Sequence, residues 1–542
     1  MPRGGRLAAG ESPSTTDGPT KENSRFITYI TDIEGDREYL TRYVELSRVL
    51  RFRNNTIANN NPSNLPYDHC IDFVSATNSE ETSPVLVFGG DIWDQGGSDL
   101  YVIRQLLDLK RRYPHRVYLV LGNRDLNKMR LHAELGSSNH DMPPHHPGVH
   151  WLKGSQKLGD LNQPNHELRD PVERLKWMLR DTMGSPRAFE YRRLELQEER
   201  NESVSDQDVV DSYRTSCHPN GEMGEYLANA HLAVRLGSVL FVHGSLPHTK
   251  DVLTNGGDPS RLWEGDLRFA MPWLTPDADH EVESASDWIH ALNSFARHEI
   301  YEWRKNPPRG PSLWSSVGGY HDLPGEMRTG AQVMQYGMGW LPDRTRNPTI
   351  VYASWGTDGM PRRFFPNDGD PAFVQATRSF FQASGLSLIC SGHQPQGDMP
   401  NAIRVLLEDN SNAWILCADT SYSGDVIWHN SDRSAPGREG SLSGRGKRAV
   451  SEVLLTQNVK TGEIVEAICH GILSDGTEYE THPLPWRDEE TDQDPRVGCI
   501  AQGSRVPSDS PHNGPWWTRA AFKDSSRLLV AGEAYDVWNL IV

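Results

Sequence analysis

The sequence predicts an α/β protein whose reactive side chains follow the ends of its strands. Two observations predict this class. Apolar, β-prone runs alternate with segments of helical spacing, and five of these runs end directly in a polar turn. Ligands of such sheets bind at the carboxyl ends of the strands. A third observation, the length of 542 residues, predicts several domains or one large core with insertions.

The first predicted strands and helices alternate over about a hundred residues. Residues 1–24 contain no apolar periodicity, and we expect a disordered tail there. Order is predicted to begin at Arg25, where the run RFITYITDIEGD alternates apolar and polar residues before an acidic turn. The elements expected next are a helix over Glu38–Arg51, a strand within Pro84–Gly97, a helix over Leu100–Arg112 and a strand within Arg116–Asp125.

Insertions separate the later strands. Gly136–Asp170 is rich in His, Pro and Asn and predicts a loop, whereas Pro171–Arg200 has a charged helical pattern. Further strands with polar turns are predicted in Gly237–His248 and Leu386–Asp398, followed by two closing strands. The predicted organisation is a main domain at 25–430 with insertions at about 130–230 and 250–385, a flexible linker at 431–450, and a β-rich C-terminal extension at 451–542 that begins with a small meander.

Composition excludes several classes of protein. The net charge of −18 disfavours general nucleic-acid binding and binding to anionic membranes. No apolar run approaches the roughly 18 residues of a membrane helix, and the first residues lack the apolar core of a signal peptide. Six cysteines without a CxxC pair argue against a thiolate zinc site or a disulfide scaffold. We therefore expect a cytoplasmic protein, whose oligomeric state the sequence leaves open.

The predicted strand ends carry the residue types that bind divalent metal ions. Oxygen donors combined with imidazole suit manganese, iron or zinc in an open hydrolytic site. A carboxylate that bridges two ions is the central requirement of two-metal hydrolysis. Each short motif is weak by itself, but five in order after β-prone runs form a strong joint signal. The candidate ligands are Asp32, Glu34, Asp91, Asn123, His243 and His393.

These motifs resemble those of the calcineurin-like metallophosphoesterase superfamily, nearest its phosphoprotein-phosphatase and diadenosine-polyphosphatase-like branch. That family's motifs read Asp-x-His-Gly, Gly-Asp-x-x-Asp-Arg-Gly, Gly-Asn-His-Glu/Asp, a His-Gly turn and a late His. The resemblance covers roughly residues 25–430. The matching segments are Asp32-Ile33-Glu34-Gly35, Gly90-Asp91-Ile92-Trp93-Asp94-Gln95-Gly96, Gly122-Asn123-Arg124-Asp125, Val242-His243-Gly244 and Ser391-Gly392-His393.

The resemblance implies a four-layer α/β/β/α sandwich of two mixed sheets and a centre of two divalent ions. Asp32 would bind the first ion, Asp91 would bridge both, and a hydroxide between the ions would attack phosphorus. The resemblance assigns the second ion to Asn123, His243 and His393.

Three residues depart from the family's pattern. Glu34 replaces a metal-binding His; as an anionic, harder ligand it favours manganese or magnesium over zinc or iron, unless it faces away and cripples the first site. Gln95 replaces the arginine that binds the substrate phosphate. Arg124 replaces the His that protonates the leaving group. An arginine holds its proton too tightly for that role, but it binds a phosphate oxygen with two donors.

The remaining roles follow from these departures. We expect manganese as the preferred metal, with iron, zinc and magnesium as alternatives. Phosphate binding is assigned to Arg124 together with Asn123 and Gln95. Asp94 and Asp125 are expected to pair with Arg124 and to fix its guanidinium, which makes Asp94, Arg124 and Asp125 the predicted catalytic residues.

The leading functional prediction is hydrolysis of a phosphomonoester on a protein or a small molecule. Loss of leaving-group protonation, typically worth about 10²–10⁴-fold in rate, favours good leaving groups. A nucleotide or phosphoanhydride hydrolase of the dinucleoside-polyphosphate type is therefore the alternative, unless His248 serves as the acid. A third reading is a pseudophosphatase that kept the fold and acts as a scaffold.

Overall fold

The computed structural model describes residues 23–54, 65, 67–74, 81–135, 170–247, 284–307, 329–339, 349–356, 360–366, 369–397, 399–420, 449–473, 476–484, 497–500, 517–521, 527–531 and 537–541. Most of the predicted tail and linker, the predicted loop before residue 170 and His248 lie outside these residues.

A seven-stranded mixed sheet forms one half of the core. Its order is β14-β13-β12-β1-β4-β5-β6. The strands from β1 to β6 run parallel, and those from β1 to β14 run antiparallel. The bounds are β1 (Ser24–Ile30), β4 (Val85–Phe88), β5 (Val117–Val120), β6 (Ala230–His231), β12 (Val450–Asn458), β13 (Ile464–Ile472) and β14 (Glu478–Leu484).

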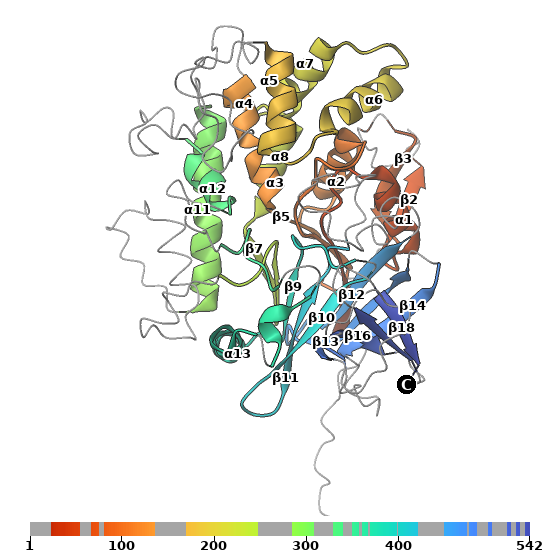
Figure 1. Ribbon diagram of the computed structural model, residues 1–542, viewed down its shortest axis with the longest axis vertical. Coiled ribbons are helices and arrows are strands. Elements are labelled where there is room, and N and C mark those ends of the chain that lie inside the picture. The colour runs from red at the N-terminus through yellow and green to blue at the C-terminus, as the bar shows by residue number, and fades with distance from the viewer. Residues whose placement is uncertain are drawn as a thin grey trace, which may run out of the picture.

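The predicted C-terminal meander is present as β12 to β14, but it is not a separate sheet. Strand β12 pairs antiparallel with β1, with Ser24 opposite Asn458 and Tyr29 opposite Val453. Strand β1, the first strand of the chain, is therefore a neighbour of β12, which begins more than four hundred residues later, and the meander widens the sheet that carries the first predicted ligands (Figure 1).

A five-stranded mixed sheet forms the other half. Its order is β10-β11-β9-β8-β7, with β11, β9 and β8 parallel and both edge strands antiparallel. The bounds are β7 (Ala233–Leu236), β8 (Val239–Val242), β9 (Leu388–Ser391), β10 (Asn401–Leu406) and β11 (Asn412–Cys417).

The two sheets share a buried apolar core. Side chains that alternate along β1 and β8 point into it, and the rings of Tyr29 and Phe241 lie 5.2 Å apart between the sheets. Such alternation is the period-two pattern of a strand with one face on a core. The predicted α/β class with two mixed sheets is confirmed.

Helices cover both outer faces. On the large sheet, α1 packs on β12, α2 on β5 and α8 on β6; on the small sheet, α11 packs on β7 and α13 on β10 (Figure 1). Helix α1 begins after Asp36, whose carboxylate accepts the backbone N–H of Tyr39 at 2.8 Å. The bounds are α1 (Arg37–Leu46), α2 (Asp99–Arg112), α8 (Glu222–Asn229), α11 (Ala285–Lys305) and α13 (Pro371–Ser384).

The helix predicted over Glu38–Arg51 is shorter than expected. It ends at Leu46, because Leu50–Asn54 forms strand β2 and pairs with β3 (His69–Phe73). Cross-strand pairing overrides the helical spacing of the last residues.

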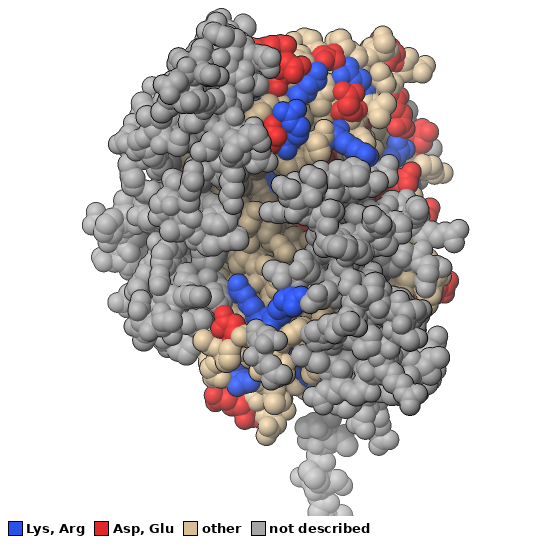
Figure 2. Space-filling view, in the orientation of Figure 1, with Lys and Arg blue, Asp and Glu red and all other residues tan. Residues whose placement is uncertain are grey.

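A group of helices gathers at the top of the molecule in Figure 1. They include the described part of the predicted 130–230 insertion, and its charged segment is helical, with one π-helical turn. Positive and negative side chains alternate on this described surface (Figure 2). The elements are α3 (Asn123–Asn127), α4 (Met129–Leu135), α5 (Pro171–Trp177), the π-helix η4 (Met178–Thr182), α6 (Ala188–Arg200) and α7 (Asp206–Ser216).

The last strands form a small antiparallel sheet against β10. The indole of Trp517 stacks on Phe365 at 5.8 Å and donates to the carbonyl of Ala402 at 3.0 Å. The remaining elements are α12 (Ala331–Tyr336), the 3₁₀ turn η7 (Arg362–Phe364), β15 (Cys499–Ile500), β16 (Trp517–Ala521), β17 (Arg527–Ala531) and β18 (Val537–Ile541).

Two further observations concern the cysteines and the helices. All six cysteines are free thiols. Within the described ranges, every helix is too short or too polar to cross a bilayer.

Helix α6 places a buried ionic cluster against α2. Arg192 Nη2 lies 3.3 Å from Asp99 Oδ2, and Glu195 accepts the backbone N–H of Tyr101 at 2.9 Å. Burial raises the pKa of Glu195 to about 7 and that of Asp99 to about 6, although Arg192 opposes both shifts. Both acids therefore bind protons more tightly in the folded chain than in the unfolded one.

We expect Glu195→Gln to reduce the pH dependence of the free energy of unfolding. The folded-state pKa of Glu195, about 7, lies above its ordinary 4.5, so its contribution is complete below the ordinary value and is lost as the pH rises through 7. Glutamine keeps an acceptor for Tyr101 but does not ionise. The variant should gain about 3 kcal/mol over the natural protein at pH 8 and little at pH 4.

Urea unfolding at both pH values measures this difference. Glu198→Gln, at an exposed position of the same helix, is the control and should show no such difference between the two pH values. An equal gain for Glu195→Gln at pH 4 and pH 8 would contradict the pKa argument.

Candidate metal centre

The candidate site lies where strands of both sheets end. Asp32 follows β1, Asp91 follows β4 and Asn123 follows β5, whereas His243 and His393 follow β8 and β9. The parallel strands deliver these residues to one place, as the spacing of the motifs predicts.

Backbone strain is concentrated at this place. A positive φ costs a non-glycine residue about 1–2 kcal/mol, and such residues cluster at functional sites. Five of the non-glycine residues with positive φ in the described chain belong to the predicted motifs. They are Asp32 (52°), Glu34 (52°), Asp91 (55°), Asp94 (117°) and His393 (68°).

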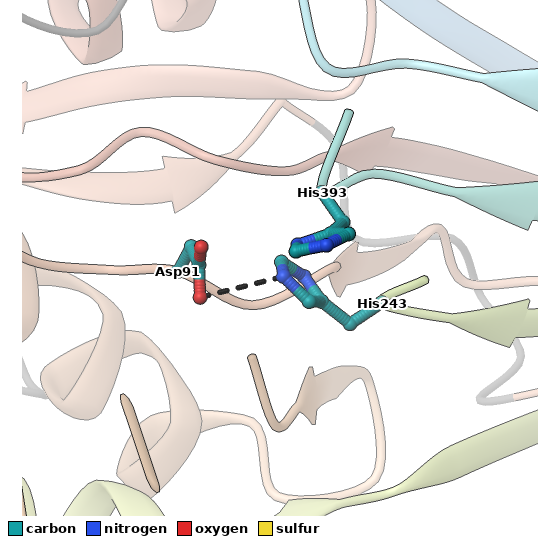
Figure 3. A group of neighbouring side chains, drawn as sticks. All are labelled: Asp91, His243 and His393. Carbon is teal, nitrogen blue, oxygen red and sulfur yellow. Dashed lines mark ion pairs between the residues drawn. The ribbon is translucent and has the colours of Figure 1, made fainter. Parts of the chain in front are cut away.

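Four of the predicted ligands converge. Asn123 Oδ1 lies 3.1 Å from His243 Nε2 and 3.0 Å from His393 Nδ1. His243 Nε2 lies 3.4 Å from Asp91 Oδ1, as the dashed line in Figure 3 marks. One ligand atom from each of Asp91, His243 and His393 lies within 4.8 Å of the others. A carboxylate, an amide oxygen and two imidazoles suit a divalent ion such as manganese, iron or zinc, so these residues fit one metal ion.

The environment of His243 favours a positive charge at this point. Its Nδ1 lies 2.9 Å from the carbonyl of Gly89, the contact that commonly orients a metal-binding imidazole. Burial lowers the pKa of His243, but the carboxylates of Asp91 and Asp32 outweigh burial and raise it to about 10. Either a proton on His243 or a bound cation supplies the positive charge that these carboxylates require.

The glycines of the second and third motifs permit the close approach of these groups. A Cβ on Gly122 would lie 2.1 Å from Asp91 Oδ1, and a Cβ on Gly90 would lie 2.9 Å from His243 Nδ1. Gly90 also has a φ of 98°, which side chains disfavour. The Gly-Asp and Gly-Asn pairs are therefore steric requirements of the cluster.

Arg124 lies beside these ligands and pairs with the other acids. Its Nε is 2.8 Å from Glu34 Oε1, and its Nη1 is 3.4 Å from Asp94 Oδ2. Nη1 also donates to the carbonyl of Met183 and to Ser185 Oγ, both at 3.2 Å. Burial lowers the pKa of Arg124, but Glu34 and Asp94 outweigh burial and raise it above its usual value. Arg124 is thus a fixed cation, and its Nη2 has no partner among the residues that the structure describes.

Lys128 is a part of the site that the sequence analysis missed. Its Nζ is fully buried, lies 2.6 Å from Asp94 Oδ2 and donates to the carbonyl of Arg124 at 3.1 Å. The signal in the sequence was a lysine four residues after Arg124, between the apolar Leu126 and Met129. A lysine in such surroundings needs a buried acidic partner.

Asp125 does not take the predicted role. Its carboxylate accepts the backbone N–H groups of Asp91 at 3.0 Å, Ile92 at 2.9 Å and Gly122 at 2.8 Å. It therefore joins the turns after β4 and β5, because three buried N–H groups need an acceptor there. Asp94 alone of the two predicted acids pairs with Arg124.

Gln95 and Asp32 are also held by protein groups. The amide of Gln95 is buried and donates to the carbonyl of Gly184 at 3.2 Å, where sequence analysis expected a phosphate contact. Asp32 Oδ2 accepts from Thr31 Oγ1 at 2.6 Å and from the backbone N–H of His393 at 3.1 Å. Burial and then the charge of Asp419, which the motifs did not indicate, raise the pKa of Asp32 well above its usual value.

Comparisons with known proteins find a weak likeness. No family model and no curated protein matches the sequence. Among solved structures, the cold-active protein-tyrosine phosphatase of a psychrophilic Shewanella species is 12% identical, with a TM-score of 0.34 over 84% of this chain and 80% of that one. A protein serine/threonine phosphatase from Saccharomyces cerevisiae, similar to human phosphatase PP5, is 12% identical, with a TM-score of 0.28 over 80% of this chain and 73% of that one. Likenesses of this size establish neither family nor activity.

We expect Asp125→Ala to destabilise the site and the fold together. Three buried N–H groups would lose their acceptor, at about 1–3 kcal/mol for each unsatisfied group. The free energy of unfolding should fall by roughly 3 kcal/mol or more, and Mn²⁺ should bind more weakly because the Asp91 turn is released.

Chemical denaturation and calorimetric titration with Mn²⁺ measure the two effects. Asp211→Ala on α7, an exposed acid paired with Arg214, is the matched control and should change stability by no more than about 0.5 kcal/mol. Unchanged stability in Asp125→Ala would show that the carboxylate does not hold the turns.

Proposed function

We propose that the protein is a metal-dependent hydrolase of phosphomonoesters. The observation that carries the proposal is a metal donor set adjoining a fixed guanidinium. Asp91 lies 3.4 Å from His243 through one oxygen and 3.6 Å from Arg124 Nε through the other. A cation site beside an arginine is the arrangement that binds and polarises a phosphoryl group.

The residues of the site would have separate tasks. Asp91, Asn123, His243 and His393 would hold a divalent ion. When bound, that ion would supply Lewis acidity and lower the pKa of a coordinated water. Arg124 would bind a non-bridging phosphate oxygen through Nη2, the nitrogen that has no partner among the described residues. Asp94 and Lys128 would hold the guanidinium in position.

The nature of Arg124 restricts the leaving group. Its raised pKa prevents it from giving up a proton, and Asp94 is paired with Lys128. Substrates whose leaving group departs without protonation are therefore favoured, which means aryl phosphates and phosphoanhydrides above alkyl phosphates. This observation supports phosphoanhydride hydrolysis of the dinucleoside-polyphosphate type as a second candidate function.

The test is hydrolysis by the full-length protein of para-nitrophenyl phosphate, a bis-aryl diester, an alkyl monoester and a diadenosine polyphosphate, with Mn²⁺, Mg²⁺, Zn²⁺ or chelator. We expect Mn²⁺-dependent turnover of the aryl monoester that Asp91→Asn and His393→Asn abolish. Arg124→Gln should lower kcat/KM by roughly 10²–10³-fold, because a charge-stabilising donor is removed.

His298→Asn is the matched control, because His298 is exposed on α11, and it should keep full activity. Turnover of the anhydride well above the aryl ester would select the second candidate. Absence of metal-dependent turnover on every substrate would refute the hydrolase and favour the scaffold.

A further inference from the structure

We propose that the chain holds a single divalent ion and that the guanidinium of Arg124 takes the place of the second. This inference rests on the metal site of the proposed function, but not on any particular substrate. It changes the expectation of a two-ion centre that the motifs suggest.

The two carboxylate oxygens of Asp91 face different partners. Its Oδ1 faces His243 Nε2 at 3.4 Å, on the side of the converging ligands. Its Oδ2 faces Arg124 Nε at 3.6 Å. In a two-ion centre a second metal ion would also have to lie within reach of Asp91, away from the converging ligands. Here a guanidinium nitrogen lies on that side.

Glu34 already has a cationic partner. The motifs assign this residue to the first ion, but its Oε1 lies 2.8 Å from Arg124 Nε. The side chains of both residues are nearly buried, at 8% and 12% exposure. A metal ion that claimed Glu34 would have to displace the guanidinium and leave a buried positive charge with fewer partners, which is strongly unfavourable.

Arg124 is held from its other side as well. Asp94 and the carbonyl of Met183 bind Nη1, and Lys128 binds both Asp94 and the carbonyl of Arg124. The guanidinium cannot leave without breaking these contacts. It is thus a resident cation of the site.

Two of the three departures from the family's motifs then have one explanation. Glu34 and Arg124 each stand where that family has a histidine, and here they are bound to each other. The carboxylate of Glu34 and the guanidinium of Arg124 form an internal ion pair in place of the first ion. Asp32, the remaining expected ligand of that ion, accepts hydrogen bonds from Thr31 and from the backbone of His393 instead.

Counting bound metal tests this inference without any assay of activity. Full-length protein is stripped with chelator, loaded with Mn²⁺, desalted and analysed for metal per chain. Its electron paramagnetic resonance spectrum distinguishes an isolated Mn²⁺ from an exchange-coupled pair. We expect one ion per chain and an isolated spectrum. Two ions per chain, or a coupled spectrum, would overturn the inference and leave the proposed hydrolase standing, whereas no bound metal would overturn both.

Restoring the motif residues gives the complementary test. The double variant Glu34→His/Arg124→His removes the ion pair and should bind two ions per chain with a coupled spectrum. Arg180→His, an exposed arginine that contacts Asp181, is the control and should keep one ion. His393→Asn should bind Mn²⁺ at least tenfold more weakly. If the double variant retains its circular dichroism spectrum and still binds one ion, Arg124 is not what replaces the second ion.

Discussion

The burial of negative charge at the strand ends is the constraint on which the rest of the site depends. Asp32, Glu34, Asp91 and Asp94 are each no more than 6% exposed. Unpaired carboxylates at such burial are very costly, so each must find a cation, a hydrogen-bond donor or a proton. Arg124 and Lys128 are buried beside these carboxylates and pair with them. The carboxylates of Asp91 and Asp32 also raise the pKa of His243.

The same turns are strained, and the structure offsets that strain locally. Five motif residues adopt positive φ, and the N–H groups of the turns after β4 and β5 would be unsatisfied without Asp125. The carboxylate of Asp125 therefore supplies the hydrogen-bond acceptor that both turns need. The oxygen of Asp91 that faces His243 is held in this direction because the Asp91 backbone is fixed by this contact.

The strand ends and their polar residues could be predicted from sequence because period-two alternation followed by a glycine and an acid is a local pattern. The directions in which these side chains point could not be predicted from the sequence. Asp94 and Asp125 both lie in glycine-containing motifs, and only the three-dimensional positions of Arg124 and of the backbone N–H groups separate their roles.

The position of β12 in the sheet was also not predicted, since its partner β1 precedes it by more than four hundred residues and no local signal encodes that pairing. Lys128 was missed for a similar reason, because its partner Asp94 lies thirty-four residues away.

The ion pair between Glu34 and Arg124 links the electrostatics of the site to the chemistry open to it. A guanidinium supplies positive charge and directed donors, but it neither releases a proton nor lowers the pKa of water as a metal ion does. The proposed centre of one ion and one guanidinium would keep the capacity to bind a phosphoryl group and to stabilise charge on its oxygens, while leaving-group protonation has no evident source in the described part of the site. The proposed hydrolysis would then depend on the intrinsic stability of the departing group. The ion pair between Glu34 and Arg124 would in this way favour substrates with a stable departing group, whichever phosphorylated molecule the protein meets.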